Sequence, residues 1–406
     1  MSSDLGRETG ALDVAPGWPD HDPWPPDPQE PMHPLVAAAR RVAKQVVEPR
    51  AAQIEDHGVT RELLDRLAAA RLIGAESADA VPAVSREVTE TLSGASGSAW
   101  FVAAQHRTPY RMLAASENAS LRERWLAGMA EGRLLGAIAL GHLRRPKPAI
   151  TATPSGRGWR LDGVADWCTG WGLTDVLLVG AVAVGAPGDG GGRDTVGHAG
   201  DPGGADKAAG RHVFALLPAR SEHHGGPAGL GASEPLRFAA MRGAHTSRLY
   251  FSHVELDAAD IVAVQPRQDW LAADAHATAS AKPAAIGVLR RALAALANLA
   301  HRRGDPPTQR AVDQLAGAAQ AARTRAYRMA DDATSTVAER AAVRGELLDL
   351  AVRATSSLVV ARGGASMAEV DPAARWAREA LFHLVQAQSY DVRAATLAAI
   401  GGTGAR

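Results

Sequence analysis

The decapeptide DVLLVGAVAV, residues 175–184, is apolar, rich in valine and bounded on both sides by turn-forming sequence. Such a short apolar run predicts a buried β-strand. Further short apolar or alternating runs occur on both sides of it, namely LLGAIAL, AITATPS, GWRLDG, HVFALLP and SRLYFSHVEL. We therefore predict a middle antiparallel β domain over residues 133–265. Residues 185–211 interrupt it with glycine-rich sequence, which predicts a flexible loop.

On both sides of the β domain the apolar residues recur at helical spacing. Residues 34–132 predict an N-terminal helical domain, in which Ser120 to Glu123 have the spacing of a capping box. Residues 266–402 predict a C-terminal four-helix bundle, with helices near 281–303, 308–331, 334–362 and 372–397. Residues 1–33 are rich in proline and acids, and we expect a disordered arm. The predicted fold class is α+β, in the order helices, sheet, bundle.

Charge and composition exclude several classes of protein. The 44 basic residues equal the 44 acidic residues, so no broad basic field is present for nucleic acid or an anionic membrane. Apolar runs are shorter than the ~20 residues that a bilayer requires. Cys168 is the single cysteine, which rules out an intrachain disulfide and a thiolate zinc site. We expect a cytoplasmic protein without a metal, since the first residues also lack the pattern of an export signal.

Two segments of the β domain resemble the acyl-CoA dehydrogenase superfamily. Gly158-Trp-Arg-Leu-Asp-Gly163 followed by Trp167-Cys168-Thr169 is similar to the family's hairpin and to the Trp-Ile-Thr/Ser segment that lies against the flavin. An indole offers apolar surface beside an isoalloxazine, and a hydroxyl or backbone N–H can bond its polar edge. The later stretch Met241 to Thr246 resembles the family's Arg-Gly-Ser-Asp-Thr segment. The resemblance extends over nearly all of residues 34–402 and implies bound FAD.

The C-terminal region carries the most telling match. Gly363-Gly364 and then Pro372-Ala-Ala-Arg-Trp-Ala-Arg-Glu-Ala380 are similar to the family's paired glycines and its Pro-x-x-Arg-x-x-Arg-Asp-Ala pattern. The resemblance implies that the glycines let a backbone approach the adenosine and pyrophosphate of a FAD held by a neighbouring subunit. It therefore implies a homodimer or homotetramer. Asp371 and Pro372 also fit the N-cap and first position of a helix.

The sequence departs from the family at two flavin-contacting segments. An acidic, glycine-rich loop should follow LLGAIAL, but the chain continues from Leu140-Gly141 into His-Leu-Arg144-Arg145. Those arginines either face a phosphate or are exposed surface residues. The family's Arg-x-Gln-Phe-Gly segment is altered, leaving Arg302 and Gln309 as candidate contacts. The implied FAD contacts are Leu140, Gly141, Trp167, Cys168, Thr169, Arg302, Gln309, Gly363, Gly364 and Ser389.

The third departure concerns the catalytic base. The family's Tyr-Glu-Gly-Thr string aligns with Gln386-Ala387-Gln388-Ser389, so alanine replaces the glutamate that removes the substrate's α-proton. Ser389 retains a hydroxyl. An alternative family position, on the first bundle helix, falls near Ala277 and also lacks a carboxylate. Asp391 and His276 are the remaining weak candidates, so the resemblance predicts slow dehydrogenation.

Three functions follow from this resemblance. The leading hypothesis is an FAD-dependent oxidoreductase acting on an acyl thioester or carrier-bound small molecule. The second is a flavin-dependent monooxygenase of the same fold, in which no carboxylate base is needed. The third is a non-catalytic relative that binds a ligand or partner.

Overall fold

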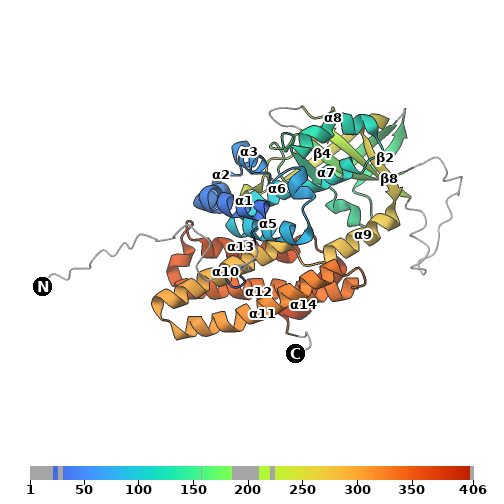
Figure 1. Cartoon of the computed structure of the whole chain (residues 1–406). Helices are drawn as coiled ribbons and strands as arrows, with labels where there is room; N and C mark the ends of the chain where they lie inside the picture. Colours follow the sequence, from blue (N-terminus) through green and yellow to red (C-terminus); the bar gives the residue numbers. More distant parts are fainter. Residues whose placement is uncertain (1–21, 26–30, 157, 185–209, 220–224, 403–406) are drawn as a thin grey trace.

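The computed structural model describes residues 22–25, 31–156, 158–184, 210–219 and 225–402. An N-terminal group of helices, a sheet and a C-terminal group of long helices follow one another along the chain (Figure 1). This agrees with the predicted order of helices, sheet and bundle. The predictions for residues 1–21 and 185–209 fall outside the described residues. The predicted loop 185–211 extends too far by one residue at least, because Arg211 begins a strand.

The N-terminal region is helical, as predicted. Thr60 caps α3 by accepting a hydrogen bond from the N–H of Leu63. The predicted capping box at Ser120 is wrong: Asn118 is the N-cap of α8, and the Ser120 hydroxyl donates to the Asn118 side chain. The α-helices are α1 (Pro34–Val42), α2 (Ala51–His57), α3 (Arg61–Ala69), α4 (Ala75–Ala78), α5 (Pro82–Ala95), α6 (Gly97–Ala104), α7 (Arg107–Ala114) and α8 (Ala119–Ala130).

The middle region forms one sheet of eight strands in the order β6-β7-β3-β2-β4-β5-β8, with β1 also beside β4. Strand β4 is buried along its whole length, as its unbroken apolar run requires. The prediction of an antiparallel domain is wrong for two pairs, because β1 and β2 both run parallel to β4. The strands are β1 (Gly136–Ala139), β2 (Ile150–Ser155), β3 (Gly158–Cys168), β4 (Val176–Ala183), β5 (Arg211–Pro218), β6 (Leu230–Ala232), β7 (Ser247–Leu256) and β8 (Ile261–Pro266).

The C-terminal region contains α9 (Arg267–Ala279), α10 (Pro283–Arg303), α11 (Pro306–Asp331), α12 (Val337–Arg362), α13 (Pro372–Val385) and α14 (Tyr390–Ile400). Asp371 caps α13, as predicted. The stretch Arg267–Arg303 is apolar and long enough to cross a membrane, but 78% of its apolar window is buried within the protein, as in a core helix.

The predicted fourth bundle helix, 372–397, is wrong in one respect, because the chain breaks it into α13 and α14. Ala387 adopts a positive φ of 47° at the break. The Arg344 guanidinium, only 1% exposed, donates to the carbonyls of Gln386, at 2.5 Å, and of Thr278. Ser389 then caps α14. The buried arginine satisfies carbonyls that a continuous helix would have kept for its own hydrogen bonds.

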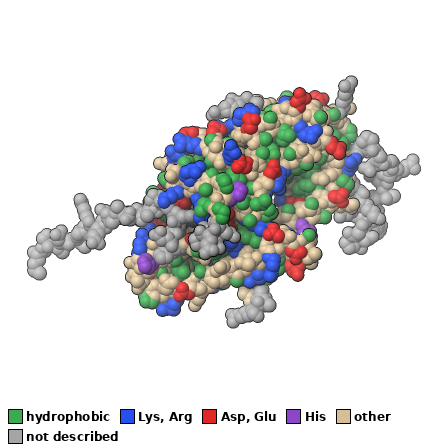
Figure 2. Space-filling view, in the orientation of Figure 1, with side chains coloured by type: hydrophobic (Ala, Val, Ile, Leu, Met, Phe, Trp, Pro, Cys, Tyr) green, Lys and Arg blue, Asp and Glu red, His purple; other side chains and the backbone are tan. Residues whose placement is uncertain are grey.

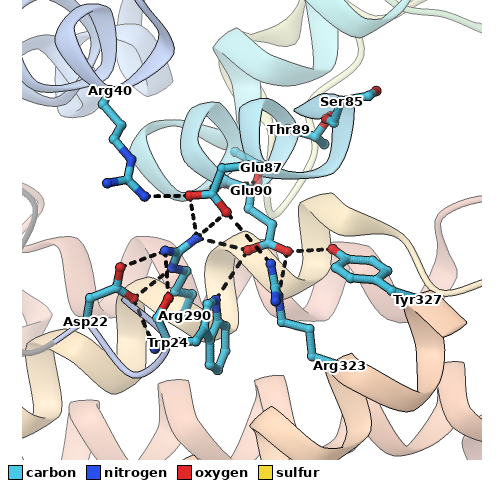
Figure 3. Close-up of polar contacts among 11 residues, drawn as sticks. Asp22, Trp24, Arg40, Ser85, Glu87, Thr89, Glu90, Arg290, Arg323 and Tyr327 are labelled. Atoms are coloured by element: carbon cyan, nitrogen blue, oxygen red, sulfur yellow. Dashed lines mark hydrogen bonds and ion pairs between the residues drawn. The ribbon is translucent and has the colours of Figure 1, made fainter. Parts of the chain in front are cut away.

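Part of the predicted disordered arm is packed. Trp24 is 8% exposed and belongs to the apolar core of the bundle. Its indole N–H donates to Glu90 at 3.3 Å, and Asp22 pairs with Arg290 at 2.6 Å (Figure 3). The prediction is therefore wrong for residues 22–25, because two specific side chains find buried partners that the average composition of the arm does not reveal.

Candidate active site

A cavity of about 1680 Å³ lies where the sheet, the N-terminal helices and the first part of the bundle meet. Its wall includes the ends of β1 and β3, the joint between α9 and α10, and the break between α13 and α14. Of the predicted contact residues, Leu140, Gly141, Trp167 and Thr169 line this cavity. A concave site of this kind, mostly apolar with a few polar groups, is the usual form of a small-molecule site.

The end of β3 supplies an aromatic wall. Trp167 is 54% exposed, and its ring packs on that of Phe238 with centroids 5.1 Å apart. The buried hydroxyl of Thr169 is hydrogen-bonded to that of Thr246 at 3.0 Å. Cys168 lies in the sheet core and is fully buried, and burial raises the pKa of its thiol to about 12. Its thiol therefore does not face the cavity, as the alternation of side chains along a strand requires.

The basic segment after β1 forms a short 3₁₀ helix, η3 (Gly141–Arg144). Arg144 makes two hydrogen bonds to Asp274 of α9, at 2.6 and 2.8 Å. Arg145 pairs with Asp166. The surface alternative is confirmed for Arg145, which is exposed, and is wrong for Arg144, which is partly buried. Both arginines are engaged by carboxylates of the cavity wall.

The bundle side of the cavity brings together the two positions where the family resemblance implies a carboxylate. Ala277 of α9 and Ala387 at the α13–α14 break both line the cavity. Arg344 joins the two segments through the carbonyls of Thr278 and Gln386. Burial, followed by the charge of Arg144, lowers the pKa of Arg344 to about 10. The weak base candidates lie elsewhere: His276 and Asp391 are exposed, and neither is part of the cavity wall.

Every carboxylate that the described wall contributes is held by an arginine. Asp166 and Asp274 are paired as given above, and Asp79 lies 3.8 Å from Arg111. His106 uses both ring nitrogens, toward the carbonyl of Met129 and the N–H of Gly136, and burial lowers its pKa to about 4. Among the described residues, no group of three or more His, Cys, Asp or Glu is placed to hold a metal ion.

Lys282 is the cavity residue that sequence reasoning missed. It is the N-cap of α10, and its Nζ donates to the carbonyl of Ala277 at 2.6 Å. A signal was available, because the chain has 40 arginines and only four lysines. A lysine directly before Pro283, at the start of an apolar helix, is therefore an unusual choice for this chain.

The other predicted contacts lie at the far end of α10, whose 21 residues span ~30 Å. Arg302, Gln309, Gly363 and Gly364 are exposed there. Arg303 donates to the carbonyl of Ala361 at 2.8 Å, which holds the ends of α10 and α12 together. A Cβ atom at position 363 or 364 would meet no atom of the described residues within 4 Å. Gly363 ends α12 with a φ of 66°, a conformation that favours glycine, so the fold of the chain accounts for Gly363 but not for Gly364. The role of both glycines as FAD contacts stays a prediction.

The helices, mixed sheet and bundle form the acyl-CoA dehydrogenase fold. The structure is similar to butyryl-CoA dehydrogenase from Megasphaera elsdenii, with 17% identity and a TM-score of 0.68 over 92% of this chain and 98% of that one. A glutaryl-CoA dehydrogenase from Mycobacterium smegmatis in complex with FADH2 gives 15% identity and a TM-score of 0.71, covering 91% and 94%. Dibenzothiophene monooxygenase from Paenibacillus sp. A11-2 gives 18% and 0.69, covering 91% and 98%. No protein-family profile and no curated protein sequence matches the chain.

Proposed function

We propose that this protein is an FAD-dependent oxidoreductase that acts on an acyl thioester or a carrier-bound small molecule in the cytoplasm. The observation that carries the proposal is the large cavity, whose wall includes both the exposed indole of Trp167 and the α13–α14 break. An exposed tryptophan inside an apolar cavity is suited to cover a flat aromatic ring. The similarity to a dehydrogenase solved with FADH2 supports the choice of ring.

The residues fit a flavin in two separate places. Trp167, Thr169 and the Leu140-Gly141 segment would contact the isoalloxazine within the cavity. Arg302, Gln309 and the two glycines, exposed ~30 Å away, would contact the adenosine half of a flavin held by another copy of the chain. A homo-oligomer would then complete each site. Bound FAD would supply the electron acceptor, and the protein would exclude water and orient the substrate.

A flavin-dependent monooxygenase is the second candidate. The observation that favours it is the absence of an unpaired carboxylate on the described cavity wall, since all three acids there are paired with arginine. Both positions that the resemblance assigns to the base are alanines. A reaction of reduced flavin with oxygen has less need of a strong base beside the substrate.

Flavin analysis tests the proposal and separates the two reactions. We expect purified protein to be yellow and to release FAD, identified by mass, on denaturation. After photoreduction, reoxidation by enoyl thioesters would support the dehydrogenase, and reoxidation by oxygen alone would support the monooxygenase. Protein that neither contains nor binds FAD would contradict both and leave the non-catalytic alternative.

Replacing Gly364 by leucine tests the second contact area. A Cβ at position 364 meets no described atom within 4 Å and Gly364 is exposed, so we expect little change in the melting temperature of the apoprotein. It would stand between the backbone and the proposed adenosine group, so the flavin content should drop several-fold. Gly317→Leu is the matched control, because a Cβ at Gly317 also meets no described atom within 4 Å. Gly317 lies on α11 and is not one of the proposed adenosine contacts. Full flavin content in Gly364→Leu would refute the proposal that the adenosine half of FAD lies beside Gly364.

A further inference from the structure

Lys282 places an amine beside Ala277, one of the two positions where the family resemblance implies a carboxylate. Its Nζ is 2.6 Å from the carbonyl of Ala277, and it shares the cavity wall with Ala387. The side chain is partly buried and forms part of the cavity wall. A neutral amine can donate to the Ala277 carbonyl and still keep its lone pair for another proton.

The surroundings of Lys282 disfavour the charged ammonium. Arg344 of α12 and Arg144 of η3 are the nearby cations, and Asp274 of α9 is the opposing acid. Asp274 is itself engaged by two hydrogen bonds from Arg144, so its charge is largely balanced.

Burial and two neighbouring cations outweigh the one neighbouring acid at Lys282. Burial, then the charges of Arg344 and Arg144, lower the pKa of Lys282 from 10.5 to about 7, while Asp274 opposes the shift. A substantial fraction of the amine is therefore neutral near pH 7. Matching the pKa of a base to the working pH is the condition for efficient proton transfer.

We propose that Lys282 is the proton acceptor of the cavity. It would take a proton from the carbon next to the carbonyl of a bound acyl compound, which rests on the substrate class proposed above. The C–H bond breaks, an N–H bond forms at Nζ, and the electron pair stays on the substrate as an enolate. The charge of the new ammonium would stabilise this anion.

Trace labelling with acetic anhydride tests the state of the amine without any turnover. The reagent acylates neutral amines, and digestion with mass analysis separates Lys282 from the other three lysines. We expect labelling of Lys282 in the folded, flavin-containing protein to reach its midpoint about three pH units below that of the same lysine in denatured protein. Equal midpoints, or no labelling of Lys282 at any pH, would overturn the proposal.

Exchange of substrate protons tests the catalytic role. Butyryl-CoA deuterated at the α-carbon should lose deuterium to water in the presence of the wild-type holoprotein. Lys282→Met should slow this loss by ~10²–10⁴-fold, the usual contribution of a general base. Lys147→Met is the matched control, because Lys147 is exposed and lies outside the cavity wall, and it should exchange at the wild-type rate. Unchanged exchange in Lys282→Met, or none in the wild type, contradicts the proposed role.

The two proposals fail in distinguishable ways. If the protein contains no flavin and Lys282 still has the lowered labelling midpoint, the oxidoreductase is refuted, whereas the lowered pKa of the Lys282 amine is retained. Protein with a full complement of FAD, an ordinary labelling midpoint and no effect of Lys282→Met would refute the proton acceptor and keep the oxidoreductase.

Discussion

Replacing Arg290 by alanine will lower the free energy of unfolding by about 3–5 kcal/mol, because it leaves buried carboxylates without their cation. The Arg290 side chain is 1% exposed and pairs with Asp22, Glu87 and Glu90 at 2.6, 2.9 and 3.1 Å (Figure 3). Glu90 is fully buried and also accepts hydrogen bonds from Arg323 and from Tyr327, at 2.8 and 2.5 Å. Chemical denaturation at neutral pH measures the loss.

Arg353→Ala is the control for this change. Arg353 pairs with Asp349 on the surface, where its side chain is 57% exposed, and such pairs contribute at most about 1 kcal/mol. Basic and acidic side chains are interspersed over the visible face of the molecule (Figure 2). Pairs between such exposed side chains are individually weak, because water and salt screen their charges. A loss for Arg290→Ala no larger than that for Arg353→Ala would show that the buried cluster is not what holds the α5–α10 contact.

The loss in free energy of unfolding caused by Arg290→Ala should also depend on pH. Burial alone would raise the pKa of Glu87, but the charge of Arg290 and hydrogen bonds from Arg40 and Arg290 outweigh it and hold this pKa below its ordinary value. A carboxyl with a lowered pKa contributes stability above the pKa of the unfolded chain, and this is lost as pH falls through the folded value. The difference between wild type and Arg290→Ala should therefore shrink in acid.

Alanine at Gly287 is expected to destabilise the protein by ~1–3 kcal/mol, whereas alanine at Gly317 should stabilise it by up to ~1 kcal/mol. At Gly287 of α10, a new Cβ would lie 2.3 Å from the carbonyl oxygen of Glu90 and from the Ser93 hydroxyl, both on α5. The carbonyl belongs to a helix backbone and cannot move aside. At Gly317 of α11 no neighbouring atom lies within 4 Å, so alanine only improves helix propensity.

Replacing glycine by alanine should therefore lower the stability of the protein at position 287 and raise it at position 317. Thermal melts of the two variants beside the wild type measure both effects. If both variants were stabilised, α5 and α10 would be able to separate without cost, and the close helix contact described here would be wrong.

The periodicity of apolar residues was sufficient to predict the order of helical and strand regions. It was insufficient to predict the break in the last helix and the packing of Trp24. Apolar spacing predicted where helices give way to strands and return, because each element buries one face. The α13–α14 break could not be predicted, since Gln386 to Ser389 contain neither proline nor glycine. Arg344, which binds the Gln386 carbonyl at the break, is 42 residues away in sequence, and Ser389 as the N-cap of α14 is the local signal. The packing of Trp24 likewise depends on partners far along the chain.

The site could be predicted only in part for the same reason. Motif matching led to Trp167 and Thr169, which the structure places together on the cavity wall. It also identified two alanines where a base was expected. Motif matching did not identify Lys282, because the role proposed for this residue depends on the cations of α12 and η3 and not on a motif in adjacent sequence.

The ionic cluster around Glu90 has a consequence for the order in which the chain assembles during synthesis. Arg323, which donates to Glu90, is encoded 233 residues later. At ~5–20 residues per second a ribosome needs on the order of ten seconds or more to add that length. Until then Glu90 would lack this partner, and before α10 is made both Glu87 and Glu90 would be exposed together with the face that later meets α10. The N-terminal helices should therefore mature only after translation of the bundle, and a nascent chain stalled before residue 323 should be a substrate for chaperones.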